Sequence, residues 1–174
     1  MEKHCNQCHG ENGHSETPDI PSIAGFSMLA TMDLLDTYRM GLRTARTVKL
    51  PDGTETNMVE VAESLSEKDE LEVVIYFANQ EWRPHPQTFD AELARRGDLV
   101  HEEKCERCHY DGGRDPESDL PLSAGQWREY LEAEFENFDS GRRAMSDKMK
   151  EKYDTLSAAD KQAIIELYVS AGNY

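Results

Sequence analysis

The sequence lacks the long hydrophobic runs and basic patches that two large functional classes require. No stretch of its 174 residues approaches the roughly 20 apolar residues of a transmembrane helix, so no membrane span is expected. Only 19 basic side chains accompany 35 acidic ones, and the net charge of −16 argues against binding nucleic acid, whose phosphates need basic patches. Residues 1–87 and 88–174 each carry −8, so the acidity belongs to the whole surface.

Signals of catalysis and of β-structure are missing as well. The sequence has no catalytic triad, no pair of carboxylates in a definable site and no phosphate-binding loop. It also has no run of alternating apolar and polar residues of the kind that forms strands. We therefore expect an all-α protein without catalytic residues of its own, whose status as an enzyme is left open.

Cysteine is scarce, and all four cysteines fall in two C-x-x-C-H motifs. In such a motif the two thiols add to the vinyl groups of a haem, and the histidine becomes the proximal iron ligand. A lone C-x-x-C also fits a redox dithiol or half of a zinc site, but here two complete motifs use every cysteine. We predict two covalently bound haem c groups, which would also supply much of the interior of a chain with only 37% hydrophobic residues and a mean hydropathy of −0.78. The motifs are Cys5-Asn6-Gln7-Cys8-His9 and Cys105-Glu106-Arg107-Cys108-His109.

The motifs lie 100 residues apart, and the residues after them repeat at the same spacing, which indicates a duplication. From Met58 onward the spacing falls to 91, so the first repeat has nine extra residues, which include the turn signal Leu50-Pro51-Asp52-Gly53. We predict an N-terminal domain at 1–83, a linker at 84–88 and a C-terminal domain at 89–174, which begins with a helix from Phe89 to Lys104. The matched pairs are Pro21 and Pro121, Gly25 and Gly125, Gly41 and Gly141, and Arg43 and Arg143.

Two methionines are the candidates for the sixth iron ligands. Met58 and Met149 each stand seven residues before a Leu-Ser pair, in a polar stretch ahead of the last helix of a repeat. A thioether ligand favours Fe(II) and raises the reduction potential relative to a second imidazole. Methionine more often fills a hydrophobic core, and this reading fits Met28, Met32 and Met40. In the second repeat Met145 remains the alternative ligand.

Further matched residues suggest how each haem is supported. Pro21 and Pro121 are candidates for the carbonyl that accepts the other N–H of the ligating histidine, although they can also simply stiffen a loop. Arg43 and Arg143 are candidates for contacts with the haem propionates, with a solvated arginine at a helix end as the alternative. The remaining histidines have no match in the repeat and are expected at the surface. They are His4, His14, His85 and His101.

The expected location follows from the cofactor. No signal peptide is recognisable before Cys5, although haem c is normally attached after export. We therefore expect a precursor with a leader and a bacterial periplasmic location.

These features resemble tandem class I cytochromes c, and the resemblance covers essentially the whole chain. It implies two tandem class I domains, each wrapped around one haem c. Cytochrome c4 and the cytochrome subunit of flavocytochrome c sulfide dehydrogenase share the pattern, and two stretches of the second repeat look closer to the flavocytochrome subunit. They are the Cys-His-x-x-Gly-Gly stretch Cys108-His109-Tyr110-Asp111-Gly112-Gly113 and Arg142-Arg143-Ala144-Met145-Ser146-Asp147-Lys148-Met149.

Membership of the flavocytochrome group implies a partner. This is an FAD-containing subunit that oxidises sulfide, in a heterodimer or larger assembly, and passes electrons to the haems for delivery to a downstream acceptor protein. FAD is expected only in that partner. The alternatives are a free-standing dihaem carrier of the cytochrome c4 kind, which serves an oxidase or reductase, and an enzyme with one open haem site.

Overall fold

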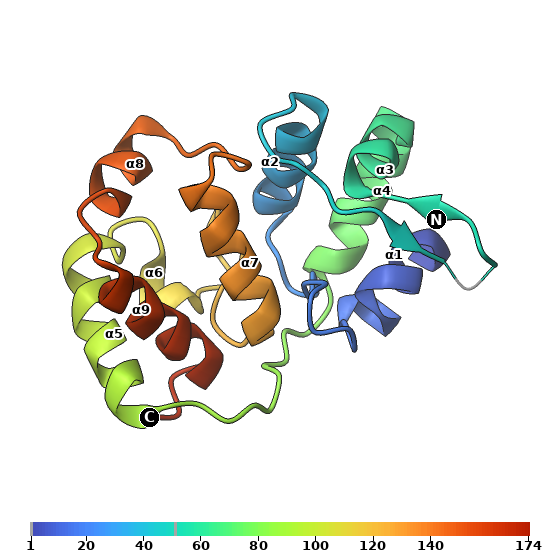
Figure 1. Cartoon of the computed structure of the whole chain (residues 1–174). Coiled ribbons are helices and arrows are strands. Elements are labelled where there is room, and N and C mark those ends of the chain that lie inside the picture. Colours follow the sequence, from blue (N-terminus) through green and yellow to red (C-terminus); the bar gives the residue numbers. More distant parts are fainter. Residues whose placement is uncertain (1, 51) are drawn as a thin grey trace.

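The computed structural model describes the backbone of residues 2–50 and 52–174, and side chains from residue 5 onward with the same gap. Its two repeats form two helical units that lie side by side and are joined by an extended linker (Figure 1). The expectation of an all-α fold is confirmed. Among the described residues, no helix is long and apolar enough to cross a membrane. The first repeat contains α1 (Glu2–His9), the 3-10 helix η1 (Glu11–Gly13), α2 (Met28–Arg39), α3 (Met58–Ser64) and α4 (Glu67–Ala78). The second contains α5 (Ala91–Lys104), α6 (Tyr110–Gly113), α7 (Arg128–Asp139), α8 (Asp147–Tyr153) and α9 (Ala158–Ser170).

The last helix of each repeat begins with the same local signal. Ser66 caps α4 by accepting the N–H of Asp69, whose carboxylate accepts the N–H of Ser66 in return. Ser157 and Asp160 form the same capping box on α9. Such reciprocal caps satisfy N–H groups that otherwise lack a partner at the start of a helix. The matched serine and aspartate pairs therefore define where both helices start.

The two repeats also share their tertiary hydrogen bonds. The N–H of Gly25 donates to the carbonyl of Phe77 over 2.9 Å, and the N–H of Gly125 donates to the carbonyl of Tyr168 over 2.6 Å. The two donors, Gly25 and Gly125, are 100 residues apart in the sequence, and the two acceptors, Phe77 and Tyr168, are 91 residues apart. The spatial match confirms the register predicted from the sequence, including its change between Gly41 and Met58.

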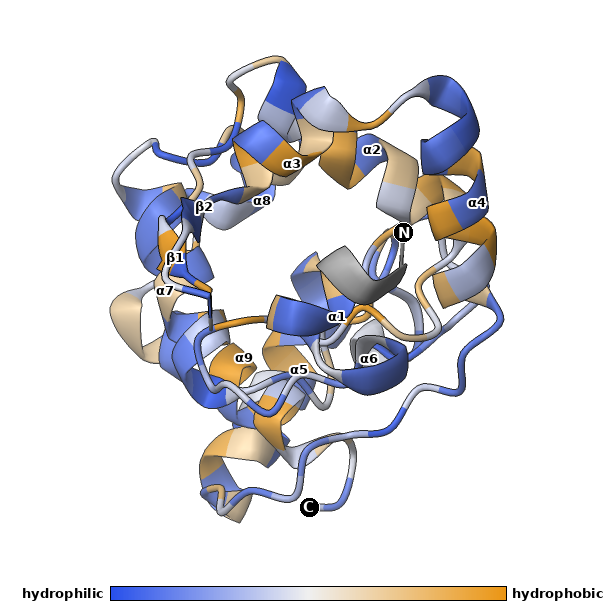
Figure 2. Ribbon diagram, turned by 90° about the vertical axis from the view of Figure 1, so that its right-hand side faces the viewer, coloured by the Kyte–Doolittle hydropathy of each residue, from blue (hydrophilic) through white to orange (hydrophobic). Residues whose placement is uncertain are grey.

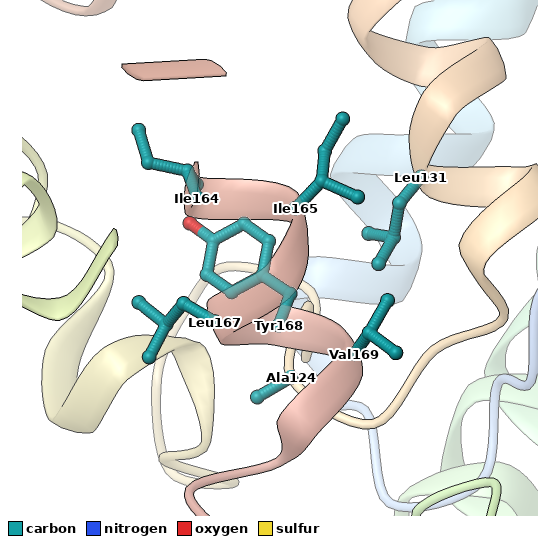
Figure 3. Packing of buried hydrophobic residues seen from close by; sticks show 7 residues of the cluster. All are labelled: Ala124, Leu131, Ile164, Ile165, Leu167, Tyr168 and Val169. Carbon is teal, nitrogen blue, oxygen red and sulfur yellow. The ribbon is translucent and has the colours of Figure 1, made fainter. Parts of the chain in front are cut away.

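The helix before the second motif is longer than its counterpart before the first. Helix α5 has 14 residues and α1 has eight. Helix α5 packs along α9, which is buried from Ala163 to Ser170. Figure 3 shows the side chains of α9 that form this core with Leu131 of α7 and Ala124. The expected helix from Phe89 starts at Ala91, because the Asp90 carboxylate caps it.

Gly97 allows α5 and α9 to approach closely, which leads to a first prediction. A Cβ atom at this position would lie 2.1 Å from the carbonyl oxygen of Ala163. Gly97→Ala is therefore expected to lower the free energy of unfolding by about 1–3 kcal/mol, although alanine is the better helix former. Arg95→Ala, on the exposed side of the same helix, is the control for helix propensity. Thermal unfolding of both variants checks the prediction, and an unchanged Gly97→Ala midpoint would contradict it.

The extra segment of the first repeat forms a small hairpin that the sequence did not predict. Strands β1 (Val48–Lys49) and β2 (Glu55–Thr56) pair antiparallel, with Val48 opposite Thr56. The expectation that no strand forms is therefore wrong at this point. Two-residue strands are too short to produce an alternating pattern, and the hairpin forms because the turn returns the chain on itself. Pro51 of the predicted turn lies outside the described residues, but the N–H of Gly53 donates to the carbonyl of Leu50 over 2.9 Å.

Candidate functional site

The first C-x-x-C-H motif is part of a helix. Cys5 and Cys8 lie one turn apart on α1, and His9 is its last residue. His9 is buried, and its Nδ1 atom lies 2.8 Å from the carbonyl oxygen of Pro21. This contact leaves Nε2 as the nitrogen available to a metal. This is the contact that the sequence predicts for Pro21.

The chemical state of the motif residues fits covalent haem better than the alternatives. All four cysteines are free, and burial raises the pKa of Cys5 and raises that of Cys105 to about 11. A redox dithiol needs the opposite shift, toward the thiolate. Within the part of the chain that the structure describes, no group of three or more His, Cys, Asp and Glu side chains could hold a metal ion. Burial lowers the pKa of His9, so its ring is neutral and can offer a lone pair to haem iron.

The second motif is folded differently. Helix α5 ends at Lys104, and the motif continues as turns rather than as helix. The Nδ1 atom of His109 is buried without a hydrogen-bond partner, so the contact expected with Pro121 is found in the first repeat only, at Pro21. The different backbone accounts for this, because His109 has φ −101° and ψ 69° and lies outside a helix.

Two histidines expected at the surface make specific contacts instead. His101 is 1% exposed, and its Nδ1 atom lies 3.2 Å from the carboxylate of Glu106 within the second motif. His85 of the linker stacks on Trp127, with ring centroids 4.0 Å apart. Sequence comparison of the repeats missed both because neither matches a histidine in the other repeat. The side chain of His4 lies outside the described residues, and His14 is half-buried.

The candidate sixth ligands begin matched helices. Met58 is the first residue of α3 and Met149 is the third residue of α8, and both are half-buried. Asn57 and Ser146 cap these helices. Met145 lies in the loop before α8 and lines a surface cavity of about 280 Å³ with Phe138 and other residues of α7–α9. Met149 remains the better candidate, because the register of 91 matches it to a methionine, Met58, in the first repeat.

A buried cluster of charges joins the domains at the two matched arginines. Arg43 and Arg143 form an antiparallel β-bridge, and both ion-pair with Glu134 of α7, Arg43 over 2.9 Å. Arg43 is 5% exposed and also donates to the hydroxyl of Tyr130 over 3.2 Å. Its Nε atom is buried without a partner. The cluster has two positive charges and one negative, so it could still accept an anionic group such as a haem propionate.

The rest of the junction is held by side chains that span the two repeats. Gln126 is fully buried, accepts the N–H of Ser22 over 3.0 Å and donates to its carbonyl over 2.8 Å. The indole N–H of Trp127 donates to the carbonyl of Ser15 over 2.9 Å. Because these bonds are directional and buried, they fix the orientation of one domain on the other. Nothing in the motifs or the repeat indicates these roles for Gln126 and Trp127.

Known proteins resemble this chain over most of its length. No protein-family model matches it. Cytochrome c4 of Azotobacter vinelandii is 22% identical over 151 residues, which cover 80% of this chain and 69% of that protein. Cytochrome c4 of Stutzerimonas stutzeri is 24% identical with the same coverage. The chain is therefore similar to cytochrome c4 over about four fifths of its length.

Solved structures show the same fold. Reduced recombinant cytochrome c4 from Pseudomonas stutzeri matches with a TM-score of 0.74 and 23% identity, over 95% of this chain and 92% of that one. Cytochrome c4 of Acidithiobacillus ferrooxidans matches with a TM-score of 0.75 and 21% identity, over 97% and 99%. Thiosulfate dehydrogenase (TsdBA) from Marichromatium purpuratum matches with a TM-score of 0.74 and 24% identity, over 95% of this chain and 36% of that one.

These matches confirm the predicted fold of two tandem cytochrome c domains. The two complete attachment motifs and the similarity to cytochrome c4 together support two covalent haem c groups. The assignment of individual ligands, the limits of the domains and the partner proteins remain predictions.

Proposed function

We propose that this cytochrome c4-like chain is the electron-transfer subunit of a periplasmic sulfide-oxidising flavocytochrome c. An FAD-containing subunit would oxidise sulfide and pass electrons singly to this chain, which would relay them to a downstream acceptor protein. The observation that carries the proposal is the stretch from Arg142 to Met149, which resembles the cytochrome subunit of that enzyme. The similarity to part of a thiosulfate dehydrogenase, a protein named for a sulfur compound, supports a role in sulfur oxidation.

The chain's own residues would do two things for this relay. His9 and Met58 in one domain, and His109 and Met149 in the other, would hold the irons in six-coordinate sites without an open position. A haem in such a site accepts and releases one electron, and methionine ligation favours its reduced state. The second task is to keep the distance between the haems constant. Glu134, between the arginines of both domains, serves this task.

The proposal is tested by the optical spectrum of the protein after gentle purification from its own host. We expect a flavin band beside the haem bands, and prompt reduction of both haems after sulfide is added. Flavin released by acid and haem measured on the same sample should be present at about one to two, as one FAD and two haems per complex require. Sulfide added to the purified cytochrome chain alone is the control for direct reduction. A complex without flavin whose haems ignore sulfide would contradict the proposal.

A free-standing electron carrier is the second candidate. The structural match covers 95% and 97% of this chain and 92% and 99% of the two cytochrome c4 chains, so nearly the whole of this chain has the fold of those proteins. This candidate predicts a protein that purifies without flavin and is reduced or oxidised by an oxidase or reductase of the same host. Chemical cross-linking of intact cells before lysis distinguishes it from a complex whose flavin subunit is lost during purification.

A further inference from the structure

Helices α2 and α4 of the first repeat expose a group of large apolar side chains. Figure 2 shows the two helices side by side on this repeat, each with hydrophobic segments. Five residues of these helices have exposed fractions well above those of a core. They are Met28 at 38%, Leu29 at 55%, Met32 at 37%, Leu71 at 50% and Ile75 at 43%. We call these five residues the apolar face.

The second repeat carries different side chains at the same positions, of which three are exposed and one, Glu166, is buried. The registers of 100 and 91 place charged or polar residues at all five matched positions. Arg128 and Glu166, which match Met28 and Ile75, form an ion pair between α7 and α9, with one N–O distance of 3.0 Å. The matched residues, in the order of the apolar face, are Arg128, Glu129, Glu132, Gln162 and Glu166.

The same comparison shows that the apolar face is continuous. Glu132 and Gln162 line one surface groove between α7 and α9. The register therefore places their counterparts Met32 and Leu71 at the corresponding contact between α2 and α4, next to Met28 and Ile75. A contiguous exposed apolar patch of this kind marks an interaction site more often than scattered apolar residues do.

Neither a haem nor another helix of the domain explains the exposure. Charged residues at the matched positions indicate that a haem does not cover these side chains, since a position covered by haem would be apolar in both repeats. Helix α5 of the second repeat covers α9, yet Glu129, Glu132 and Gln162 stay exposed beside it. A helix placed like α5 on the first repeat would therefore leave Leu29, Met32 and Leu71 uncovered.

Charge decides which occupant fits. Exposed carboxylates border the apolar face at Asp33 of α2 and at Glu67 and Glu72 of α4, and the nearby Lys68 is 3.7 Å from Glu72. Two copies of a chain with a net charge of −16 repel each other, and so do this chain and an anionic membrane. A protein with a basic rim around an apolar centre is attracted instead.

We propose that the apolar face of the first domain docks a redox partner whose contact surface is apolar at its centre and basic at its rim. This inference deepens the proposed function, on which it rests for the redox nature of the partner. Apolar contact supplies affinity at the centre, and the carboxylates speed and orient the encounter. The second domain has charged or polar residues at the same positions, so its matching surface is available for a different partner.

The test uses the holoprotein and mitochondrial cytochrome c, a basic redox protein, as the probe. Met32→Gln/Leu71→Gln removes the apolar centre without a change in charge. We expect the Kd measured by calorimetry at low ionic strength to rise at least about tenfold, because apolar residues at the centre of an interface carry most of its affinity. Glu132→Ala/Gln162→Ala at the matched positions of the second domain is the control, and its Kd should stay within about twofold. Equal melting temperatures for all variants exclude unfolding as the cause.

Several results would overturn the proposal. An unchanged Kd in Met32→Gln/Leu71→Gln would show that the apolar face takes no part in docking. A concentration-dependent dimer seen by sedimentation and lost in this variant would assign the face to a second copy of the chain. Binding of the wild type to neutral phosphatidylcholine vesicles, lost in the variant, would assign it to a membrane. The probe contains no flavin and the test no sulfide, so its outcome is independent of the test of the sulfide dehydrogenase function.

Discussion

Replacing Glu134 with alanine is expected to lower the free energy of unfolding of the holoprotein by about 3–5 kcal/mol, because removing one partner of a buried ion pair leaves the other charge uncompensated. Here a single carboxylate pairs with both Arg43 and Arg143. Urea denaturation at pH 7, followed by tryptophan fluorescence and haem absorbance, measures the change. Arg142→Ala, next to the cluster but exposed, is the control and is expected to cost less than about 1 kcal/mol.

The Glu134→Ala variant also tests whether Arg43 and Arg143 pair with the haem propionates. The Nε atom of Arg43 is buried without a partner, which leaves room for a contact with a haem propionate. A loss below about 1 kcal/mol in Glu134→Ala would show that another anion already compensates both arginines. That result would contradict the central role of Glu134 at the junction and make the propionates the main partners of the arginines.

Glu134 also predicts a dependence of stability on pH. Burial alone would raise the pKa of Glu134, but Arg43 and Arg143 outweigh it and hold the pKa below its ordinary value of 4.5. A carboxylate with a lowered pKa in the folded state contributes its full stability above about pH 5 and loses it as the pH falls through the folded pKa. Glu134→Gln should therefore lose less stability than the wild type as the pH falls from 5 to 3.

Matched residues made the fold predictable from the sequence. The pairs Gly41 and Gly141, and Asp69 and Asp160, mark the ends and starts of helices, because turns and caps depend on a few neighbouring residues. The observed glycines have φ angles of 66° and 72°, in the left-handed region that ends a helix. A cap or turn residue that occurs at matched positions of both repeats is easier to recognise than a single one. The repeat therefore predicts the order of the helices and the register.

Unmatched residues carried the features that the sequence did not predict. Glu134 corresponds to Leu34 and His101 to Met1, so neither belongs to a matched pair of like residues. The contact of Glu134 with Arg43 spans 91 positions, and it depends on how the domains pack rather than on any local pattern. The apolar face also depends on a difference between the repeats, because its five apolar residues match charged or polar residues in the second repeat.

Replacing Met149 with alanine is expected to open the sixth coordination position of the second haem iron. The measurement is carbon monoxide binding to the reduced protein, which should rise from near zero in the wild type to about one molecule per chain, because an iron that loses its thioether has no protein ligand on that side. The reduction potential of that haem should also fall, since methionine ligation favours Fe(II). Met58→Ala should have the same effects on the first haem.

Met145→Ala is the matched control, because Met145 lies four residues away and lines the cavity beside Phe138 instead. It should leave carbon monoxide binding near zero and lower stability by about 1 kcal/mol, because the side chain is only half-buried. If Met145→Ala opened the iron and Met149→Ala did not, the register of the second repeat would be wrong between Gly141 and Leu156. Rapid carbon monoxide binding by the wild type would instead show an open haem site, and the chain would then be an enzyme rather than a carrier.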